Sequence, residues 1–325
     1  MKKGLIALGG ALLLSFGTIT RYSVKEDPEF LSVEQRWVDS VFNSLSPDQR
    51  IAQLFMVAAY SNLGIKHVRE IKELITDYNI GGLIWMQGGP ARQGALATYY
   101  QKNSKTPLLY SIDGEWGLAM RLDTTTRYPK QMTLGAIADD SLIYQMGRQI
   151  GRECRRMGIH VNFAPVADVN NNPDNPVIGM RSFGEDKYRV AHKAYMYMKG
   201  LQDEKIMANA KHFPGHGDVD VDSHYDLPVI NKSLAQMDTT ELYPFKKLFE
   251  AGVGSVMIAH LYIPAIDNTA NRATSLSKNN VTGLLKDDMG YQGLTFTDAL
   301  EMKGVSKFFP GGEIAVQSLI AGNDI

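Results

Sequence analysis

Residues 140–168 read DSLIYQMGRQIGRECRRMGIHVNFAPVAD, and the spacing of their apolar side chains changes near the middle. In residues 140–158 the apolar side chains recur every three or four positions, which predicts an amphipathic helix. Residues 160–168 are almost continuously apolar and end in Asp168, a pattern typical of a strand buried on both faces of a parallel sheet. The stretch therefore predicts a helix that leads into a buried parallel strand, the repeating unit of an α/β fold.

The same alternation continues in both directions along the chain. Further helices are expected at 33–45, 65–78, 188–204 and 242–252. Further strands are expected at 52–59, 81–86, 107–113, 206–213, 254–261, 293–300 and 318–325. About eight such units favour a closed (β/α)8 barrel of the TIM type over an open sheet, and we expect one barrel over residues 33–325. Because no helix follows the last predicted strand, SLIAGNDI, we also expect a truncated barrel whose last helix, with or without a C-terminal domain, follows residue 325.

The N-terminal residues, MKKGLIALGGALLLSFGTIT, combine two lysines with an apolar run that glycines interrupt. This pattern is typical of a secretory signal, and the run is short for a membrane span. We interpret residues 1–25 as a signal peptide, with an uncleaved N-terminal anchor as the alternative. The protein is then expected to be exported in a bacterium, either periplasmic or anchored to the membrane.

Composition excludes some classes of partner. The 325 residues carry a net charge of −1 and contain no long basic run, so we expect no binding of nucleic acid. Cys154 is the single cysteine and cannot form a disulfide within the chain. Its place in a helical pattern predicts a small buried side chain.

Charged and polar residues gather where the predicted strands end. In a barrel of this kind the active site forms at the carboxyl ends of the strands. The residues at these ends are Asp113, Asp168, Lys211, His212, His260 and Asp298. Asp298 lies in LTFTDAL between apolar residues, where a carboxylate is costly unless donors hold it. We interpret Asp298 as a nucleophile or base, with a helix N-cap as the alternative.

Residues 211–224, KHFPGHGDVDVDSH, contain three histidines and three aspartates with little apolar bulk. The two histidines of HFPGH have a spacing that could bind zinc on a helix, but the proline and glycine between them disfavour a helix. DVDVD has the start of a calcium-loop spacing, but Ser223 and Val229 stand where such a loop needs Gly and Glu. A solvated polar loop is a third interpretation.

A mobile catalytic loop is the fourth interpretation of the same stretch. Gly215 and Gly217 would let the loop bend. Asp222 lies two residues before His224, so its carboxylate can accept from one imidazole nitrogen. The other nitrogen is then available to donate a proton near neutral pH, and Asp298 could serve as the nucleophile.

These motifs resemble glycoside hydrolase family 3, in particular its subgroup that removes β-linked N-acetylglucosamine. KHFPGHGDVDVDSH resembles the loop signature of that subgroup, and NFAPVADV, IGMRSFGED, SVMIAHL, TFTDAL and AGND agree in the same order. The resemblance covers roughly residues 45–325. It implies a (β/α)8 barrel that carries the whole site, with no cofactor and no metal.

The resemblance also implies roles for individual residues. Asp298 would attack the anomeric carbon and form a covalent glycosyl-enzyme. His224, oriented by Asp222, would protonate the leaving oxygen and then activate water, with retention of configuration. The residues expected to hold the sugar are Arg181, Lys211 and His212, together with Asp113 and Arg121. The expected substrate is a terminal GlcNAc on peptidoglycan fragments, chitooligosaccharides or glycans.

One stretch departs from the family's pattern. The family usually has D-Q-E-G-G after its third strand, whereas residues 113–117 read DGEWG. Trp116 could pack at the rim or stack on a sugar face, so the shape of the site beyond the first sugar stays open.

Four alternatives remain open. A β-glucosidase of the family typically carries its acid on a second domain and lacks the D-S-H loop. Phosphorolytic members use phosphate in place of water. A non-catalytic sugar-binding barrel would be expected to lack Asp298 or His224. A metal-dependent barrel hydrolase would need a histidine pair on the first strand, and AQLFMVAAY has none.

Overall fold

Parallel strands run in chain order across one sheet in the structure, a computed structural model that describes residues 27–32 and 35–325. The predicted signal or anchor at 1–25 lies outside the described residues. The seven strands found among them are β1 (Met56–Ala59), β2 (Gly82–Trp85), β3 (Leu109–Ile112), β4 (Val161–Asn162), β5 (Met207–Phe213), β6 (Ser255–Ile258) and β7 (Leu294–Thr297). Each strand pairs in parallel with the next, which confirms the α/β class.

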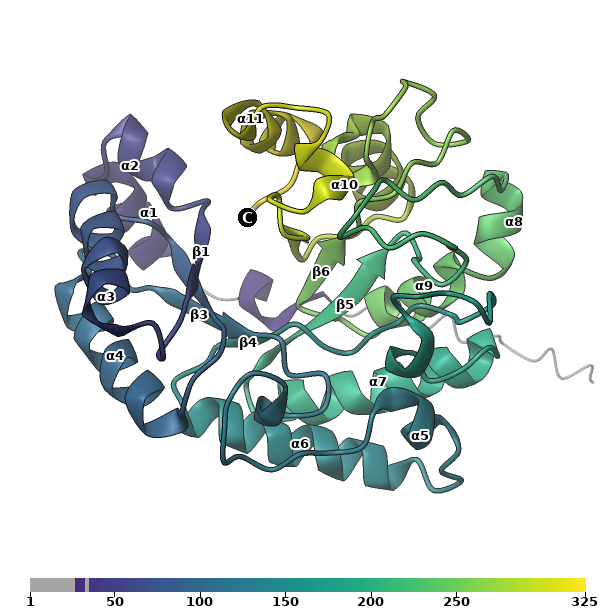
Figure 1. Cartoon of the computed structure of the whole chain (residues 1–325), viewed down its shortest axis with the longest axis horizontal. Helices are drawn as coiled ribbons and strands as arrows, with labels where there is room; N and C mark the ends of the chain where they lie inside the picture. The colour runs from purple at the N-terminus through teal and green to yellow at the C-terminus, as the bar shows by residue number, and fades with distance from the viewer. Residues whose placement is uncertain (1–26, 33–34) are drawn as a thin grey trace, which may run out of the picture.

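Helices connect the strands and surround the sheet, and Figure 1 shows α3, α4, α6 and α7 outside β1, β3 and β4. The helices are α1 (Arg36–Ser44), α2 (Pro47–Ala52), α3 (Gly64–Glu73), α4 (Pro90–Asn103), α5 (Gln131–Gly135), α6 (Ser141–Arg156), α7 (Lys187–Asp203), α8 (Leu234–Thr239), α9 (Leu242–Glu250), α10 (Lys303–Ser306) and α11 (Gly311–Ala321). Shorter or wider turns occupy Glu29–Ser32, Leu74–Tyr78, Leu118–Met120, Gly179–Arg181, Thr274–Leu276 and Asn279–Asp288. Among the described residues, no helix is both long enough and apolar enough to cross a bilayer.

The sheet is rolled up, because side chains from all its strands share one interior cluster. Its buried members are Val161, Phe163, Met257 and Phe296, and its partly buried members are Met56, Ile84, Leu109, Met207, Leu294 and Ile325. Strands β1 and β7, the edges of the described sheet, thus meet side chains of the same cluster. This curvature is consistent with a barrel of the (β/α) type, whose inward side chains fill the interior. Closure by an eighth strand stays a prediction.

The last predicted strand is wrong in its first half. SLIA belongs to helix α11, which ends where Gly322 adopts a positive φ of 110°. A short apolar run is compatible with a strand and with a buried helix. Here it forms the end of a helix that begins at Gly311. Only the tail pairs with β7, since Asp324 and Ile325 donate backbone N–H groups to Thr295. The expectation of a further helix or domain stays a prediction.

The predicted strands are longer than the strands observed, and two of them show the reason. The first begins at Met56 rather than at residue 52, because α2 extends to Ala52. β4 contains Val161 and Asn162 only, since Pro165 has no N–H to offer a ladder; the chain beyond it contacts β5 again at Val166.

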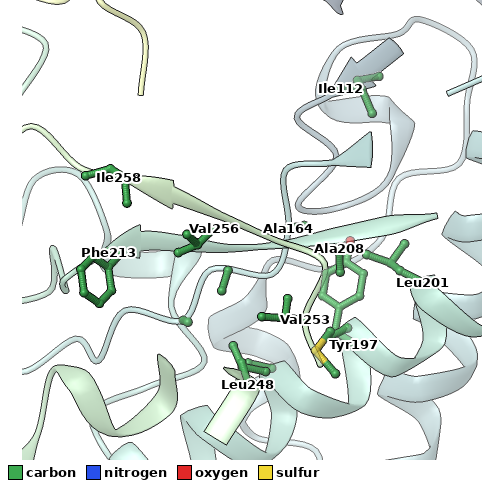
Figure 2. Close-up of a cluster of buried hydrophobic side chains, with 14 of the residues drawn as sticks. Ile112, Ala164, Tyr197, Leu201, Ala208, Phe213, Leu248, Val253, Val256 and Ile258 are labelled. Atoms are coloured by element: carbon green, nitrogen blue, oxygen red, sulfur yellow. The ribbon is translucent and has the colours of Figure 1, made fainter. Parts of the chain in front are cut away.

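The outer helices pack closely on the sheet and on one another. Helix α6 buries Ile143, Ile150 and Cys154 on the face that the periodicity predicted. Each large apolar side chain buried in this way stabilises the fold by about 1.5–3 kcal/mol. Figure 2 shows the neighbouring core, in which α7 and α9 meet β5 and β6. Burial raises the pKa of the Cys154 thiol, so this side chain stays protonated and acts as the predicted small apolar group.

Candidate active site

Three strand ends bring five charged residues together. Asp113 directly follows β3, and its carboxylate accepts from Arg121 at 2.5 Å and from Lys211 of β5 at 2.9 Å. Lys211 also lies 2.9 Å from Glu115, which receives two parallel bonds from Arg181 at 2.7 and 3.0 Å. Glu115 and Lys211 are only 1% and 2% exposed. Charges buried this deeply are tolerated because each has an opposite partner.

The pairing keeps both acids ionised. Burial by itself raises the pKa of Asp113, but Lys211 and Arg121 outweigh it and lower the pKa to about 2. Burial likewise raises the pKa of Glu115, and Arg181 and Lys211 hold it well below its usual range. The result is a rigid set of carboxylate and cationic groups, of the kind that binds several hydroxyls of one polar ligand.

Glu115 is a member of this network that was not among the predicted site residues. It connects Arg181 to Lys211, which is itself paired with Asp113 and, through Asp113, with Arg121. Its signal was present in DGEWG, where the acidic residue keeps its place although its neighbours differ from the family's pattern.

Asp168 was predicted to lie at the strand ends, but no role in the site was assigned to it. Its fully buried carboxylate lies 2.7 Å from the ring Nδ1 of His212, and it accepts from the backbone N–H groups of His212 and His216. The Nε2 atom of His212 lies 3.1 Å from Arg181, which connects this group to the first network. Burial raises the pKa of Asp168, but His212 outweighs it and the net direction is down. The predicted sugar residue His212 is thereby held in one orientation.

Asp298 directly follows β7 and is partly exposed. Its Oδ1 accepts from the N–H of Ala299 at 2.8 Å. Burial raises the pKa of this carboxyl, but His260 and then His212 outweigh it, so the net pKa is lowered and the group is ionised at neutral pH. The N-cap alternative is wrong, because α10 begins five residues later, at Lys303, and its N-cap is Met302.

His260 lies beside the Asp298 turn and two residues beyond β6, rather than at the end of the strand. Its Nε2 lies 3.0 Å from the carbonyl oxygen of Ala299, and its Nδ1 lies 2.7 Å from the hydroxyl of Ser275. Burial lowers the pKa of His260, which favours the neutral ring. Because a carbonyl oxygen only accepts, the neutral ring carries its proton on Nε2.

The predicted contact between His224 and Asp222 is present. The Nδ1 atom of His224 lies 2.7 Å from the Asp222 carboxylate, which also accepts from the His224 backbone N–H at 2.8 Å. The His224 side chain is 60% exposed. The Nε2 atom, on the other side of the ring, is therefore the one that can exchange a proton with a substrate.

The interpretation of residues 211–224 as a solvated loop is wrong for most of its length. His212, His216 and Ser223 are buried, and the exposed part is limited to the tip and to His224. Gly217 serves close packing, since an added Cβ would lie 1.7 Å from the carbonyl oxygen of Val169. Mobility of this stretch stays a prediction.

The zinc and calcium interpretations gain no support. His212 lies on strand β5, where its two ring nitrogens face Asp168 and Arg181. Of the aspartates in DVDVD, Asp218 pairs with Lys232 at 2.7 Å and Asp222 faces His224. Across residues 27–32 and 35–325, no three acidic, histidine or cysteine side chains are placed to hold a metal ion.

Trp116 packs against cations at the rim. The ammonium of Lys130 lies 5.2 Å from its ring centre and the guanidinium of Arg127 lies 6.0 Å away. These are cation–π distances, and they favour the packing interpretation of Trp116. Stacking of a sugar on this ring stays a prediction.

Comparisons with known proteins identify the family of the chain. The sequence model of the family described as "Glycosyl hydrolase family 3 N terminal domain" matches residues 46–325. The "Beta-hexosaminidase A" of Pseudoalteromonas piscicida is 35% identical over an alignment of 279 residues that covers 79% of this chain and 47% of that protein. The "Beta-hexosaminidase LpqI" of Mycobacterium tuberculosis is 33% identical, over 86% of this chain and 72% of its own length.

Solved structures give the same result. A glycoside hydrolase family 3 beta-N-acetylglucosaminidase from Paenibacillus sp. is 39% identical with a TM-score of 0.82, over 86% of this chain and 54% of its own. The beta-glucoside phosphorylase BglX is 26% identical with a TM-score of 0.86, over 93% of this chain and 56% of its own. The chain thus spans about half the length of these two proteins and of the first hexosaminidase. By the match over residues 46–325, the chain belongs to glycosyl hydrolase family 3.

Proposed function

We propose that this protein is a retaining exo-β-N-acetylglucosaminidase that removes terminal β-linked GlcNAc. One observation carries the proposal: Asp298 follows β7 where the charges of His260 and His212 favour its ionised form, while the loop that contacts α10 presents the His224–Asp222 pair. A retaining glycosidase needs a nucleophile and a proton donor that also acts as a base. Asp298 and His224 supply these two functions.

The reaction proceeds in two steps. A carboxylate oxygen of Asp298 attacks the anomeric carbon, the glycosidic bond breaks, and the proton on His224 Nε2 passes to the leaving oxygen. Neutral His224 then takes a proton from water, whose oxygen attacks the same carbon and displaces Asp298. Each step inverts the anomeric centre, so the product keeps the β configuration. Asp222 stabilises the imidazolium that exists before the first proton transfer and again after the second.

The sugar would be held by the charged network at the strand ends. Asp113 and Glu115 can accept from sugar hydroxyls, and Arg121, Arg181 and Lys211 can donate to them. Because these groups are already paired and buried, little reorganisation is needed when the sugar binds. The names of the two hexosaminidases and of the Paenibacillus enzyme support GlcNAc as that sugar. We further propose peptidoglycan fragments, chitooligosaccharides or glycans as its source, and export of the protein through residues 1–25.

The decisive test is turnover of an aryl β-N-acetylglucosaminide by the full chain, with the aryl β-glucoside alongside. We expect activity on the N-acetyl substrate, loss of it in Asp298→Asn, and the β-anomer as the first product in time-resolved NMR. An α-anomer as the first product would refute retention. A folded protein that turns over neither substrate would refute the assignment.

A second candidate is action on β-glucosides with phosphate as the acceptor. The likeness to BglX, described as a beta-glucoside phosphorylase, favours it. An imidazole base also repels an incoming anion less than a carboxylate would. Formation of a sugar 1-phosphate when phosphate is added would select this candidate, and a rate independent of phosphate would exclude it.

A further inference from the structure

The stretch 211–224 folds back so that two of its buried polar side chains meet. The Nε2 atom of His216 lies 3.2 Å from the hydroxyl of Ser223, and these residues are 1% and 2% exposed. Asp222 and His224, on either side of Ser223, are partly exposed and exposed. Ser223 lies between these two residues and is buried. Its contact with His216 therefore determines the direction in which Asp222 and His224 project. We call His216 and Ser223 the latch pair.

His216 is itself held on three sides. Its backbone N–H donates to Asp168 at 2.7 Å, and its carbonyl accepts from Asn175 at 2.8 Å. Its ring meets the ring of His212 edge to face, with centres 5.8 Å apart. Asp168 therefore fixes both a predicted sugar residue and the first member of the latch pair.

Ser223 is held from the other side of the site. Its carbonyl accepts from the N–H of Gly304 in α10, the helix that follows Asp298. An added Cβ on Gly304 would lie 2.9 Å from this oxygen, so the two backbones approach closely. The segment that carries His224 is thus clamped between the β4–β5 side and the element after β7.

Among the described residues, Ser223 is the one hydrogen-bond partner of the His216 ring. It contacts the Nε2 atom, and the Nδ1 atom has no partner in the part of the chain that the structure describes. Burial, followed by the neighbouring His212, lowers the pKa of His216 to about 4, so the ring is neutral around pH 7. A neutral buried ring with one hydrogen-bond partner, the residue that directly precedes the proposed acid, is suited to positioning rather than to proton transfer.

We propose that His216 is a positioning residue, which holds Ser223 so that His224 and Asp222 face the substrate. This inference rests on the proposed function, in which His224 donates and accepts the proton. His216 would act through Ser223, without touching the sugar's reacting atoms.

The test uses the full chain with His216→Ala, His216→Gln and Ser223→Ala. Gln can restore a polar group near the Ser223 hydroxyl, whereas Ala cannot. Ser318→Ala is the matched control, since Ser318 is also buried and its hydroxyl donates to a backbone carbonyl, that of Ala315, in α11. Two readouts are taken: hydrogen–deuterium exchange of the peptide 217–226, and kcat/KM across aryl and alkyl β-N-acetylglucosaminides.

We expect faster exchange of 217–226 in His216→Ala and in Ser223→Ala, with unchanged exchange in β5 and α6. For poor leaving groups kcat/KM should fall about 10- to 100-fold, because these need protonation; for activated aryl groups it should fall less than about threefold. His216→Gln should recover most of the loss. The double variant His216→Ala/Ser223→Ala should lose no more kcat/KM than His216→Ala alone, because the two residues act as one unit.

Two results would overturn the proposal while the proposed function stands. The first is unchanged exchange of 217–226 in both alanine variants. The second is faster exchange with equal losses on good and poor leaving groups, which would indicate a structural role alone. If the unmodified protein turns over none of the substrates, the proposed function fails, and the positioning role that rests on it is refuted as well. Exchange would still show whether the latch pair holds the segment.

Discussion

Replacing Lys211 with Met tests whether the buried charge network stabilises the fold as its geometry implies. Met has a similar length and no charge, so packing is largely kept. The change removes two charge-assisted hydrogen bonds, to Asp113 and Glu115, each 2.9 Å long. At about 1.5–3 kcal/mol for each bond, we expect a loss of about 3–6 kcal/mol in the free energy of unfolding. Losses of similar size follow when one partner of a buried pair is removed.

The same variant has a predicted pH signature. The pKa of Asp113 is about 2 in the folded protein, below its ordinary value of 3.8. A lowered carboxyl pKa stabilises the fold above about pH 4, and this stabilisation, roughly 2 kcal/mol, is lost as the pH falls toward 2. Without Lys211 the pKa should return toward its ordinary value. The difference in the free energy of unfolding between the unmodified protein and Lys211→Met should therefore decrease by about 1 kcal/mol between pH 5 and pH 3.

Urea denaturation at pH 7, 5 and 3 measures both effects. Lys199→Met is the matched control, because Lys199 is 45% exposed and pairs with Asp203 at 3.0 Å on the surface of α7. An exposed pair of this kind should contribute less than about 1 kcal/mol. Two results would refute the account of the network. One is a loss of less than about 1 kcal/mol in the free energy of unfolding of Lys211→Met. The other is a difference in this free energy between the two proteins that grows as the pH falls.

Three further predictions concern the nucleophile and the loop. Asp298→Asn should lower kcat/KM by about 10⁴-fold or more while leaving the urea midpoint nearly unchanged; retention of a tenth of the activity would exclude it as nucleophile. Burial raises the pKa of Asp298, but His260 outweighs it and the net pKa is lowered. On the acid side, kcat/KM for an activated aryl substrate should therefore fall only below about pH 4. A fall centred above about pH 5 would contradict this. Gly217→Ala should cost about 1–3 kcal/mol of stability, since its Cβ would meet the Val169 carbonyl; Gly94→Ala in α4, with open space around it, should be neutral or stabilising, and equal effects would refute the packing role.

The periodicity of the sequence predicted the repeating units well where the pattern was long. Helices α6, α7 and α9 lie within one or two residues of their predicted bounds. The errors fall where a short apolar run allowed two backbone conformations, as in SLIA, or where a proline interrupted a ladder, as in β4. The contact between Asp222 and His224 was also predictable, because the two residues lie only two positions apart.

The charged network was harder to predict. Arg181 and Glu115 are 66 positions apart in the sequence, and Lys211 and Asp113 are 98 apart. Their places at strand ends indicated a common rim, but not which cation would face which acid. That choice depends on strand order and on the cost of leaving any of these charges unpaired away from water.

The sequence by itself thus determined the α/β class, the gathering of polar residues at one edge of the sheet, and the local Asp222–His224 pair. These features follow from backbone periodicity and short spacing, which a single chain segment contains. Only the tertiary structure decided that residues 211–224 are largely buried, that Asp168 and Glu115 organise the site, and that His216 meets Ser223. Burial and pairing depend on which distant segments become neighbours, and desolvation then selects the partner of each buried charge.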